Sequence, residues 1–171
     1  ANLAGAILER ANLEGVNARN AIFDDVVANE ANFEVSTLRG AKFRRAGLVG
    51  ARLHRAYVRD ADLTSAELAG AWLRFATFDG ARCRRTDFAG ADLRYASMVE
   101  TDLKGANLTD VNVFGISAWN VETDLETRQD LIVAPSRSTG ETPLRAHDLH
   151  TAQLLALMLD GPGVRRVLDS V

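Results

Sequence analysis

The sequence predicts an all-β solenoid of stacked coils over residues 1–118, with a small α-helical segment that caps it over residues 119–171. Two observations predict the solenoid. The chain repeats with a period of five residues, with a small residue at the first position of each unit and a large apolar residue at the third. No charged residue falls on either series, although charged residues make up 25% of the chain. Each unit therefore has two inward and three outward positions.

The spacing of the inward residues decides between the regular structures. Ala occupies the first position in 17 of 24 units, and Leu or Phe occupies the third position in another 17 of 24. A helix would repeat apolar residues at i, i+3, i+4 and i+7, and a flat strand would alternate. Spacings of two and then three suit a short extended pair followed by a corner, where Gly often stands at the fifth position. Four such corners return the chain above itself and give a stack of coils.

The clearest units are Ala1-Asn2-Leu3, Ala11-Asn12-Leu13, Ala61-Asp62-Leu63, Ala91-Asp92-Leu93 and Ala106-Asn107-Leu108. They resemble the A(D/N)LXX signature of the pentapeptide-repeat family, and the resemblance covers about 118 residues without a break in phase. It implies a right-handed, quadrilateral parallel β-helix of about twenty residues per coil, hence about six coils here. With about 4.8 Å between paired strands, such a rod is about 28 Å long. Ala18, Ala28 and Cys83 stand at the large inward position and predict local thinning of the core.

Composition sets the broad class of the protein. The net charge is only −3, so no global field points to nucleic acid or to an anionic membrane. The single cysteine, Cys83, lies in the inward register, and no apolar run has the length of a signal peptide or a membrane span. We therefore expect a reduced, cytoplasmic setting. Because Ala1 is already in phase and is not Met, we expect an excised fragment with further repeats upstream.

Stacking the units by twenties gathers Arg and aromatic side chains on one outer face of the middle coils. Arg beside aromatic residues is typical of interaction hot spots and also suits stacking on nucleic-acid bases. The alternative is a ladder of Trp72, Phe75 and Tyr95 along the coils, covered by Arg side chains. Both interpretations stay open. The residues of this Arg/aromatic face are Arg52, His54, Arg55, Trp72, Arg74, Phe75, Arg94 and Tyr95.

Two further outer faces differ in character. One has almost no side chains, which favours packing of a partner, of a second copy or of the tail. The residues of this small-residue face are Val49, Gly50, Ala69, Gly70, Ala89 and Gly90. The other bands its charges by coil, and we predict that opposite charges on adjacent coils pair with one another. The residues of this charged face are Asp24, Asp25, Lys42, Arg44, Arg45, Asp62, Arg82, Arg84, Arg85, Asp102 and Lys104.

The repeat fades between residues 113 and 119, where the last coil needs a lid over its unpaired backbone groups. Phe114, Ile116 and Trp119 are large apolar residues at this point, and we predict that they form this C-terminal cap. The remaining segment predicts a short strand at 131–134, a loop at 135–143 and a helix from about 144. Gly161-Pro162-Gly163 ends that helix, and a second apolar stripe follows to Val171.

Three stretches of the C-terminal segment form a recognisable pattern: Gly115-Ile116-Ser117-Ala118-Trp119-Asn120, Gln129-Asp130-Leu131-Ile132-Val133 and residues 148–171. They resemble the connector that follows pentapeptide repeats in certain bacterial proteins. In those proteins a TIR-like (Toll and interleukin receptor) or related signalling domain comes next. The resemblance implies an effector domain beyond Val171.

The search for catalytic chemistry finds no phosphate loop and no zinc-spaced Cys/His set. His147 and His150 flank Asp148 and could form half a metal site, but a surface pair near a helix start is the simpler interpretation. Cys83 among inward apolar residues is a small hydrophobe and not a nucleophile. We predict a non-enzymatic chain without catalytic residues, metal, cofactor or small-molecule substrate.

Three functional classes remain. A scaffold within a larger bacterial signalling protein would self-associate, for example as a homodimer, and a binding module would dock a protein partner as a monomer through the Arg/aromatic face. The third class, DNA mimics that bind topoisomerases, needs rows of carboxylates. Residues 1–120 carry 15 basic and 15 acidic side chains, and residues 41–95 have a net charge of +5. This charge argues against mimicry, and nothing points to nucleic acid or membrane as a partner.

Overall fold

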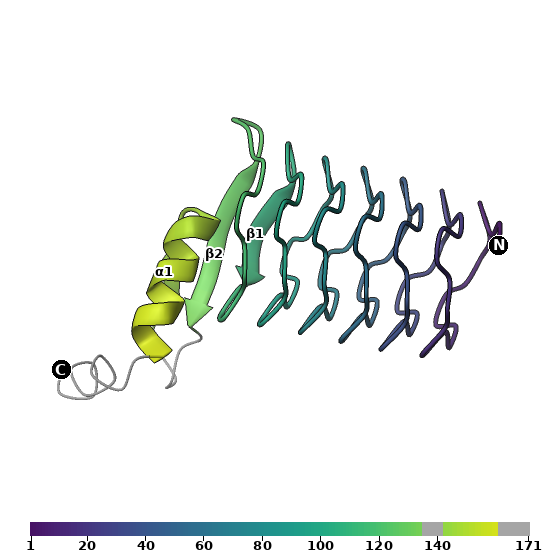
Figure 1. Cartoon of the computed structure of the whole chain (residues 1–171), viewed down its shortest axis with the longest axis horizontal. Helices are drawn as coiled ribbons and strands as arrows, with labels where there is room; N and C mark the ends of the chain where they lie inside the picture. The colour runs from purple at the N-terminus through teal and green to yellow at the C-terminus, as the bar shows by residue number, and fades with distance from the viewer. Residues whose placement is uncertain (135–141, 161–171) are drawn as a thin grey trace.

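The computed structural model describes residues 1–134 and 142–160 and shows a rod of stacked coils that carries a small cap at one end (Figure 1). The N-terminus lies at the far end of the rod from the cap. Three strands and one helix stand out from the otherwise short bridges: β1 (Asn107–Asn112), β2 (Arg128–Ala134), β3 (Leu144–Ala146) and α1 (Leu149–Asp160). No helix among the described residues is long and apolar enough to cross a membrane.

A parallel register of twenty residues builds the rod. The second residue of each unit bridges the residue twenty positions later, and this continues without interruption from Asn2 to Glu122. Four five-residue units therefore make one coil, which confirms the predicted four-sided stack. Three bridges illustrate the register on successive coils: Arg52↔Trp72, Trp72↔Asp92 and Asp92↔Asn112.

Each corner of a coil is a tight turn. The N–H of the first residue of a unit donates to the carbonyl of the preceding third residue, as from Ala6 to Leu3 at 3.0 Å. The fifth residue of every unit from 5 to 120 has a positive φ, between 50° and 70°, as in the third residue of a type II turn. Gly fits this conformation without strain, and Val35 (φ 50°) is the one β-branched residue that adopts it.

The Asn or Asp at the second position of many units has a local structural reason. Its side-chain oxygen accepts a hydrogen bond from the N–H two residues later, at 3.1 Å for Asn2 and Asp62 and 3.2 Å for Asp92. Such a bond satisfies a backbone donor at the corner, where the repeat provides no other acceptor. The signature residue is therefore a turn-forming residue, and it faces outward.

The two inward residues of each unit form one continuous core from coil to coil. In the second to sixth coils these residues are buried, and Phe23 stacks on Phe43 with ring centroids 4.6 Å apart. The polar exceptions Ser36, Thr86 and Thr101 are also buried, and each hydroxyl donates to a backbone carbonyl at 2.7–3.0 Å. Burial among apolar side chains raises the pKa of the Cys83 thiol, which agrees with its interpretation as a small hydrophobe.

The cap is a small sheet covered by α1 (Figure 1). β2 continues the parallel stack on β1, and β3 pairs antiparallel with β2. α1 packs on β2 and β3, and the Gln153 side chain, although polar, is buried where its Oε1 accepts the N–H of Ala118 at 2.7 Å. The buried apolar residues of the cap are Leu131, Val133, Ala146, Leu149, Ala152 and Ala156.

The cap differs from the sequence prediction in several respects. The predicted strand at 131–134 is part of a longer β2, and the chain at 144–146 is a strand, so α1 begins only at Leu149. Asp148 begins that helix by accepting the N–H of Thr151 at 2.8 Å. The predicted second helix falls within residues 161–171 and most of the predicted loop within 135–141, and both ranges lie outside the described residues.

The three residues predicted to cap the last coil lie in different surroundings. Ile116 is buried within the coil, and the Phe114 ring meets the edge of Tyr95 on the outer wall. Trp119 is 53% exposed. The lid over the coil is formed by β2 and α1 instead, because a paired strand satisfies the backbone groups of the coil, which side chains alone do not.

Candidate interaction face

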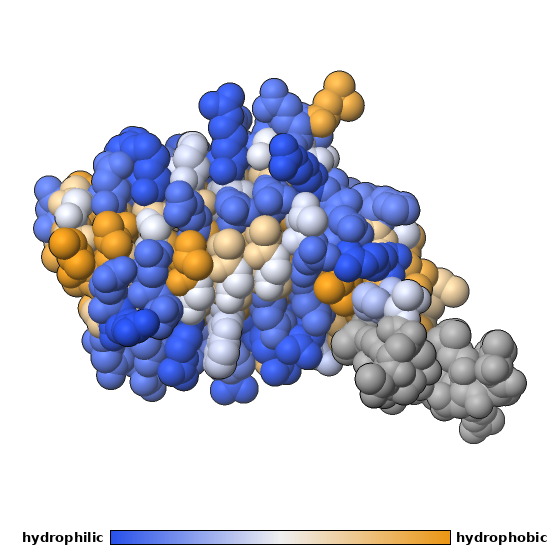
Figure 2. Space-filling view, turned by 180° about the vertical axis from the view of Figure 1, so that it is seen from behind, coloured by the Kyte–Doolittle hydropathy of each residue, from blue (hydrophilic) through white to orange (hydrophobic). Residues whose placement is uncertain are grey.

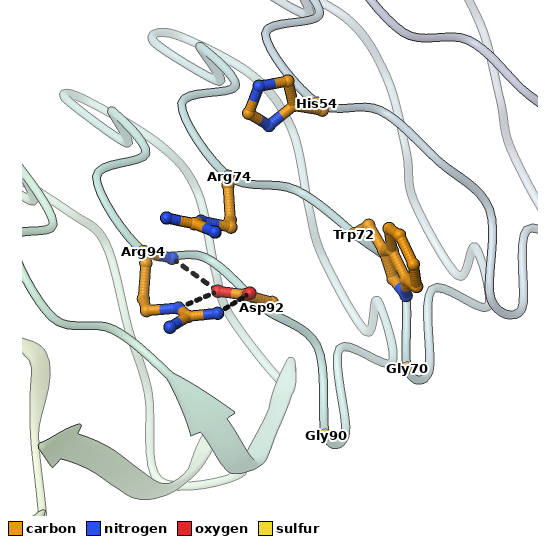
Figure 3. A pocket seen from close by; sticks show the side chains of 7 residues that line it. All are labelled: His54, Gly70, Trp72, Arg74, Gly90, Asp92 and Arg94. Carbon is orange, nitrogen blue, oxygen red and sulfur yellow. Dashed lines mark hydrogen bonds and ion pairs between the residues drawn. The ribbon is translucent and has the colours of Figure 1, made fainter. Parts of the chain in front are cut away.

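The Arg/aromatic face is formed by the third five-residue unit of each middle coil. His54, Arg74 and Arg94 occupy the same position of successive coils, and Trp72 and Asp92 occupy a second such column. These side chains, with Gly70 and Gly90 at the adjoining corner, line a hollow of about 470 Å³ (Figure 3). The structure thus brings four of the eight residues predicted for this face to one place.

The corner with Gly70 and Gly90 joins this hollow to the small-residue face. Both glycines have a positive φ, and nothing lies within 4 Å of the point where a Cβ would be. Of the other residues predicted for the small-residue face, Val49 is 40% exposed, whereas Gly50, Ala69 and Ala89 are half-buried. The two predicted faces therefore meet along one edge of the rod.

Asp92 and Arg94 form an ion pair inside the hollow. Arg94 Nε donates to Asp92 Oδ1 at 2.8 Å, and Nη2 donates to Oδ2 at 2.5 Å (Figure 3). Burial alone would raise the pKa of the Asp92 carboxyl, but the hydrogen bonds from Arg94 outweigh burial and leave this pKa lowered. Asp92 therefore stays ionised near neutral pH and holds the Arg94 guanidinium in place. The sequence pattern places Asp92 on the same outer wall as Arg94, although Asp92 is not one of the eight residues predicted for the interaction face.

Arg52 also has partners, an ion pair and an aromatic ring. Its guanidinium binds Glu34 Oε1 from the neighbouring coil, with Nε at 2.8 Å and Nη2 at 2.6 Å. It also lies over the Trp72 ring, 5.7 Å from the centroid. Trp72 nevertheless remains 58% exposed and forms one side of the hollow.

An aromatic ladder runs beside the hollow along the corner of the coils. The rings of Phe75 and Tyr95 are parallel with centroids 5.0 Å apart, and His54 meets the edge of Phe75 at 5.6 Å. Arg55 and Arg74 each lie 5.7 Å from the Phe75 ring. The ladder that the sequence allowed as an alternative thus exists for two of its three residues, whereas Trp72 stands apart from it.

Arg74 differs from Arg52 and Arg94 because it has no acceptor. Within residues 1–134 and 142–160 no carboxylate or carbonyl accepts from its guanidinium, and its Nε is buried without a hydrogen-bond partner. Figure 3 shows Arg74 between His54 and Arg94 with no bond to either. A buried donor without an acceptor is costly, so it marks a place where a further group can bind.

On the charged face the predicted pairing across coils is confirmed for Arg44, Arg45, Arg84 and Lys104, whereas Lys42, Arg82 and Arg85 form no ion pair within residues 1–134 and 142–160. Asp24 accepts from the Arg44 side chain, and the Arg44 N–H donates to Asp24 Oδ1 at 3.0 Å. These bonds hold the pKa of the Asp24 carboxyl below its usual range, against the opposing effect of burial. The other ion pairs on this face are Arg45–Asp25, Arg84–Asp102 and Lys104–Glu122.

The described residues hold no cluster of three His, Cys, Asp or Glu side chains that could bind a metal ion. His147 and His150 are both exposed near the start of α1. Between them, Asp148 is engaged as the helix cap, and its hydrogen bond from the Thr151 N–H lowers the pKa of its carboxyl.

Comparison with protein families identifies the repeat. The family described as Pentapeptide repeats (8 copies) matches residues 1–34, 41–74 and 73–110. The chain belongs to the pentapeptide-repeat family. Proteins of this family fold as right-handed quadrilateral β-helices and are generally non-catalytic. The match ends before the cap and gives no support to the resemblance of the C-terminal segment to a TIR connector.

Several solved structures are similar to the chain. HetL, a pentapeptide repeat protein involved in heterocyst differentiation regulation in the cyanobacterium Nostoc sp. strain PCC 7120, is 21% identical with a TM-score of 0.38. That comparison covers 77% of this chain and 82% of HetL. Rfr23 from the cyanobacterium Cyanothece 51142 is 26% identical over 68% of this chain and 86% of its own, with a TM-score of 0.32.

A third structure is QnrB1, a plasmid-mediated fluoroquinolone resistance protein, which is 18% identical with a TM-score of 0.43. The comparison covers 74% of this chain and 71% of QnrB1. No curated protein matches the chain. The assignment to the family rests on the repeat match alone.

Proposed function

We propose that this chain is a non-catalytic protein-binding module that docks a partner through its Arg/aromatic face. One observation carries the proposal: a guanidinium without an acceptor and a largely exposed Trp72 meet in one hollow. Arg and Trp are the residues most enriched at the energetic centre of protein interfaces, in places that a partner can close to water. The rigid stack of coils holds these groups in place before binding, which lowers the entropic cost of docking.

Site-specific photocrosslinking tests this function. A benzophenone amino acid replaces Trp72 in the chain expressed in its native cells, and a matched chain carries it at Tyr57, which is 55% exposed on another wall. We expect one defined protein adduct from position 72 and none of the same mass from position 57. Equal adducts from both positions, or none from position 72, would contradict the proposal.

A second candidate function is assembly by self-association, in which the chain acts as a scaffold. Three exposed apolar residues on successive coils favour it: Val49 of the small-residue face is 40% exposed, and Ile7 and Val27 near it are 77% and 39% exposed. Figure 2 shows one face of the rod, on which apolar side chains gather toward the N-terminal coils. Light scattering over a concentration series separates the two functions. A dimer at low micromolar concentration that Val49→Asp abolishes supports the scaffold, and a monomer supports the binding module.

Two further expectations from the sequence are kept apart from this proposal. Fusion to a signalling effector domain stays a prediction, and it is tested by the mass of the protein isolated from its native cells, compared with 18.5 kDa for this chain. Topoisomerase binding by DNA mimicry is not proposed, because the middle coils carry the charge that a mimic must avoid. We expect a supercoiling assay to show no inhibition of the topoisomerase by this chain.

A further inference from the structure

We propose that the hollow beside Arg74 binds the side-chain carboxylate of a partner peptide, supplied by an Asp or Glu that adjoins an apolar residue. This inference deepens the proposed function and rests on it. It specifies the chemistry that the Arg/aromatic face recognises and the residue that recognises it.

The first argument is the missing acceptor. Asp92, which stands eighteen positions after Arg74, would be its natural partner, since Arg84 binds Asp102 over the same interval on the charged face. Asp92 is occupied by Arg94, however, with both carboxylate oxygens engaged. Arg74 therefore lies against the Phe75 ring, and its guanidinium lines the hollow without an acceptor among the described residues. A carboxylate is the anion that a guanidinium binds best in a peptide, by two parallel hydrogen bonds.

The second argument is the charge of the hollow. Its lining holds two guanidinium groups and one carboxylate, so its net charge is +1 when the His54 imidazole is neutral. A single carboxylate neutralises this charge. A phosphate, which carries close to two negative charges, would leave an excess beside Asp92, and a nucleic acid would require several free cations in a row. The balance of charges thus favours a carboxylate over both.

The third argument is the apolar side of the hollow. Trp72 presents its ring beside the charged groups, and Gly70 and Gly90 leave the adjoining corner without side chains. An extended peptide can therefore place an apolar side chain against Trp72 while the neighbouring carboxylate reaches Arg74. The volume of about 470 Å³ is at the small end of the range for ligand pockets and suits two side chains.

The test is an NMR titration of the folded chain with short synthetic peptides. The probe is acetyl-Gly-Ser-Leu-Glu-Gly-Ser-amide, and the observed signals are the Nε–Hε group of Arg74 and the indole N–H of Trp72. We expect the Glu peptide to shift both signals in a saturable way. The matched peptide with Gln in place of Glu, and the variant Arg74→Gln, should each bind at least about tenfold more weakly, because each removes a charged hydrogen bond.

The control variant is Arg45→Gln, since Arg45 is bound to Asp25 on the charged face and should not affect the titration. Equal binding of the Glu and Gln peptides, full binding by Arg74→Gln, tighter binding of a phosphoserine peptide, or no shift at all would each overturn the inference. Photocrosslinking at position 72 keeps the two proposals apart. A partner adduct that survives Arg74→Gln supports the proposed function and rejects the carboxylate site.

Discussion

The charged face and the Arg/aromatic face are two walls of the same coils, and they differ in the partner of one corresponding Arg, which is Arg84 on the first and Arg74 on the second. On the charged face Arg84 binds Asp102, because Lys104, two residues after that Asp, binds Glu122 on the next coil. On the Arg/aromatic face the corresponding positions are Arg74, Asp92 and Arg94. Here Arg94 turns back to Asp92, and Arg74 is left without an acceptor.

The cause of this difference lies one coil further along. The residue that corresponds to Glu122 on the Arg/aromatic face is Asn112, which has no charge to draw Arg94 away from Asp92. Asn112 Oδ1 is itself buried without a hydrogen-bond partner. Asn112 thus stands where the charged face has Glu122, and Arg74 lacks an acceptor where Arg84 has one.

The largest effect is expected from a substitution in the core that lies behind both walls. Leu63 is buried in the core behind the charged face, and Leu63→Asp should unfold the rod, because an unpaired carboxylate in that core costs several kcal/mol. Loss of the β-sheet signal in circular dichroism would show this. Asp62→Ala on the outer surface is the matched control and should cost less than about 1 kcal/mol. Similar stability of both variants would refute the assignment of inward and outward residues.

The next prediction concerns a substitution that should give the Arg/aromatic face the ion-pair pattern of the charged face. Asn112→Asp should draw Arg94 onto the new carboxylate and release Asp92 to Arg74, as on the charged face. The hollow then loses its free guanidinium, and binding of the Glu peptide should weaken about tenfold, which corresponds to about 1.4 kcal/mol. The NMR titration measures this change. Asn112→Gln, which adds no charge, is the control. Unchanged peptide binding in Asn112→Asp would contradict the claim that residue 112 determines the partner of Arg94.

A smaller effect is expected from removing one charge of a satisfied pair. Asp24→Ala leaves the Arg44 N–H and side chain without their acceptor, and it should lower the free energy of unfolding by about 1 kcal/mol, since solvent screens part of the interaction. Urea denaturation at neutral pH measures this loss. An unchanged midpoint would show that the pairs of the charged face contribute nothing to stability.

The same variant has a pH dependence with a defined sign. Because the folded-state pKa of Asp24 is lowered, its contribution is present above the unfolded pKa of about 3.9 and is lost as the pH falls through the folded value. The difference in stability between wild type and Asp24→Ala should therefore shrink below about pH 4. A difference that is constant over this range would exclude the ion pair as its source.

The smallest effect is expected on the wall with the free guanidinium. Arg74→Gln removes no ion pair and no hydrogen bond, only the contact of the guanidinium with the Phe75 ring, so the free energy of unfolding should change by no more than about 0.5 kcal/mol. The same urea experiment measures it beside Asp24→Ala. A loss as large as that of Asp24→Ala would mean that Arg74 has a structural role, and the contrast between the walls would fail.

The sequence by itself determined the period, the inward residues and the walls on which the outward residues lie. These properties follow from local spacing, because a five-residue unit with a turn at its end repeats the same geometry at every corner. The tertiary structure decided which of its possible partners each charged side chain binds, since Arg84 reaches Asp102 on the next coil, whereas Arg94 binds Asp92 of its own unit. It also decided the cap, where β2 and α1, not Trp119, cover the last coil. Both depend on contacts between residues distant in sequence, which a local pattern does not encode.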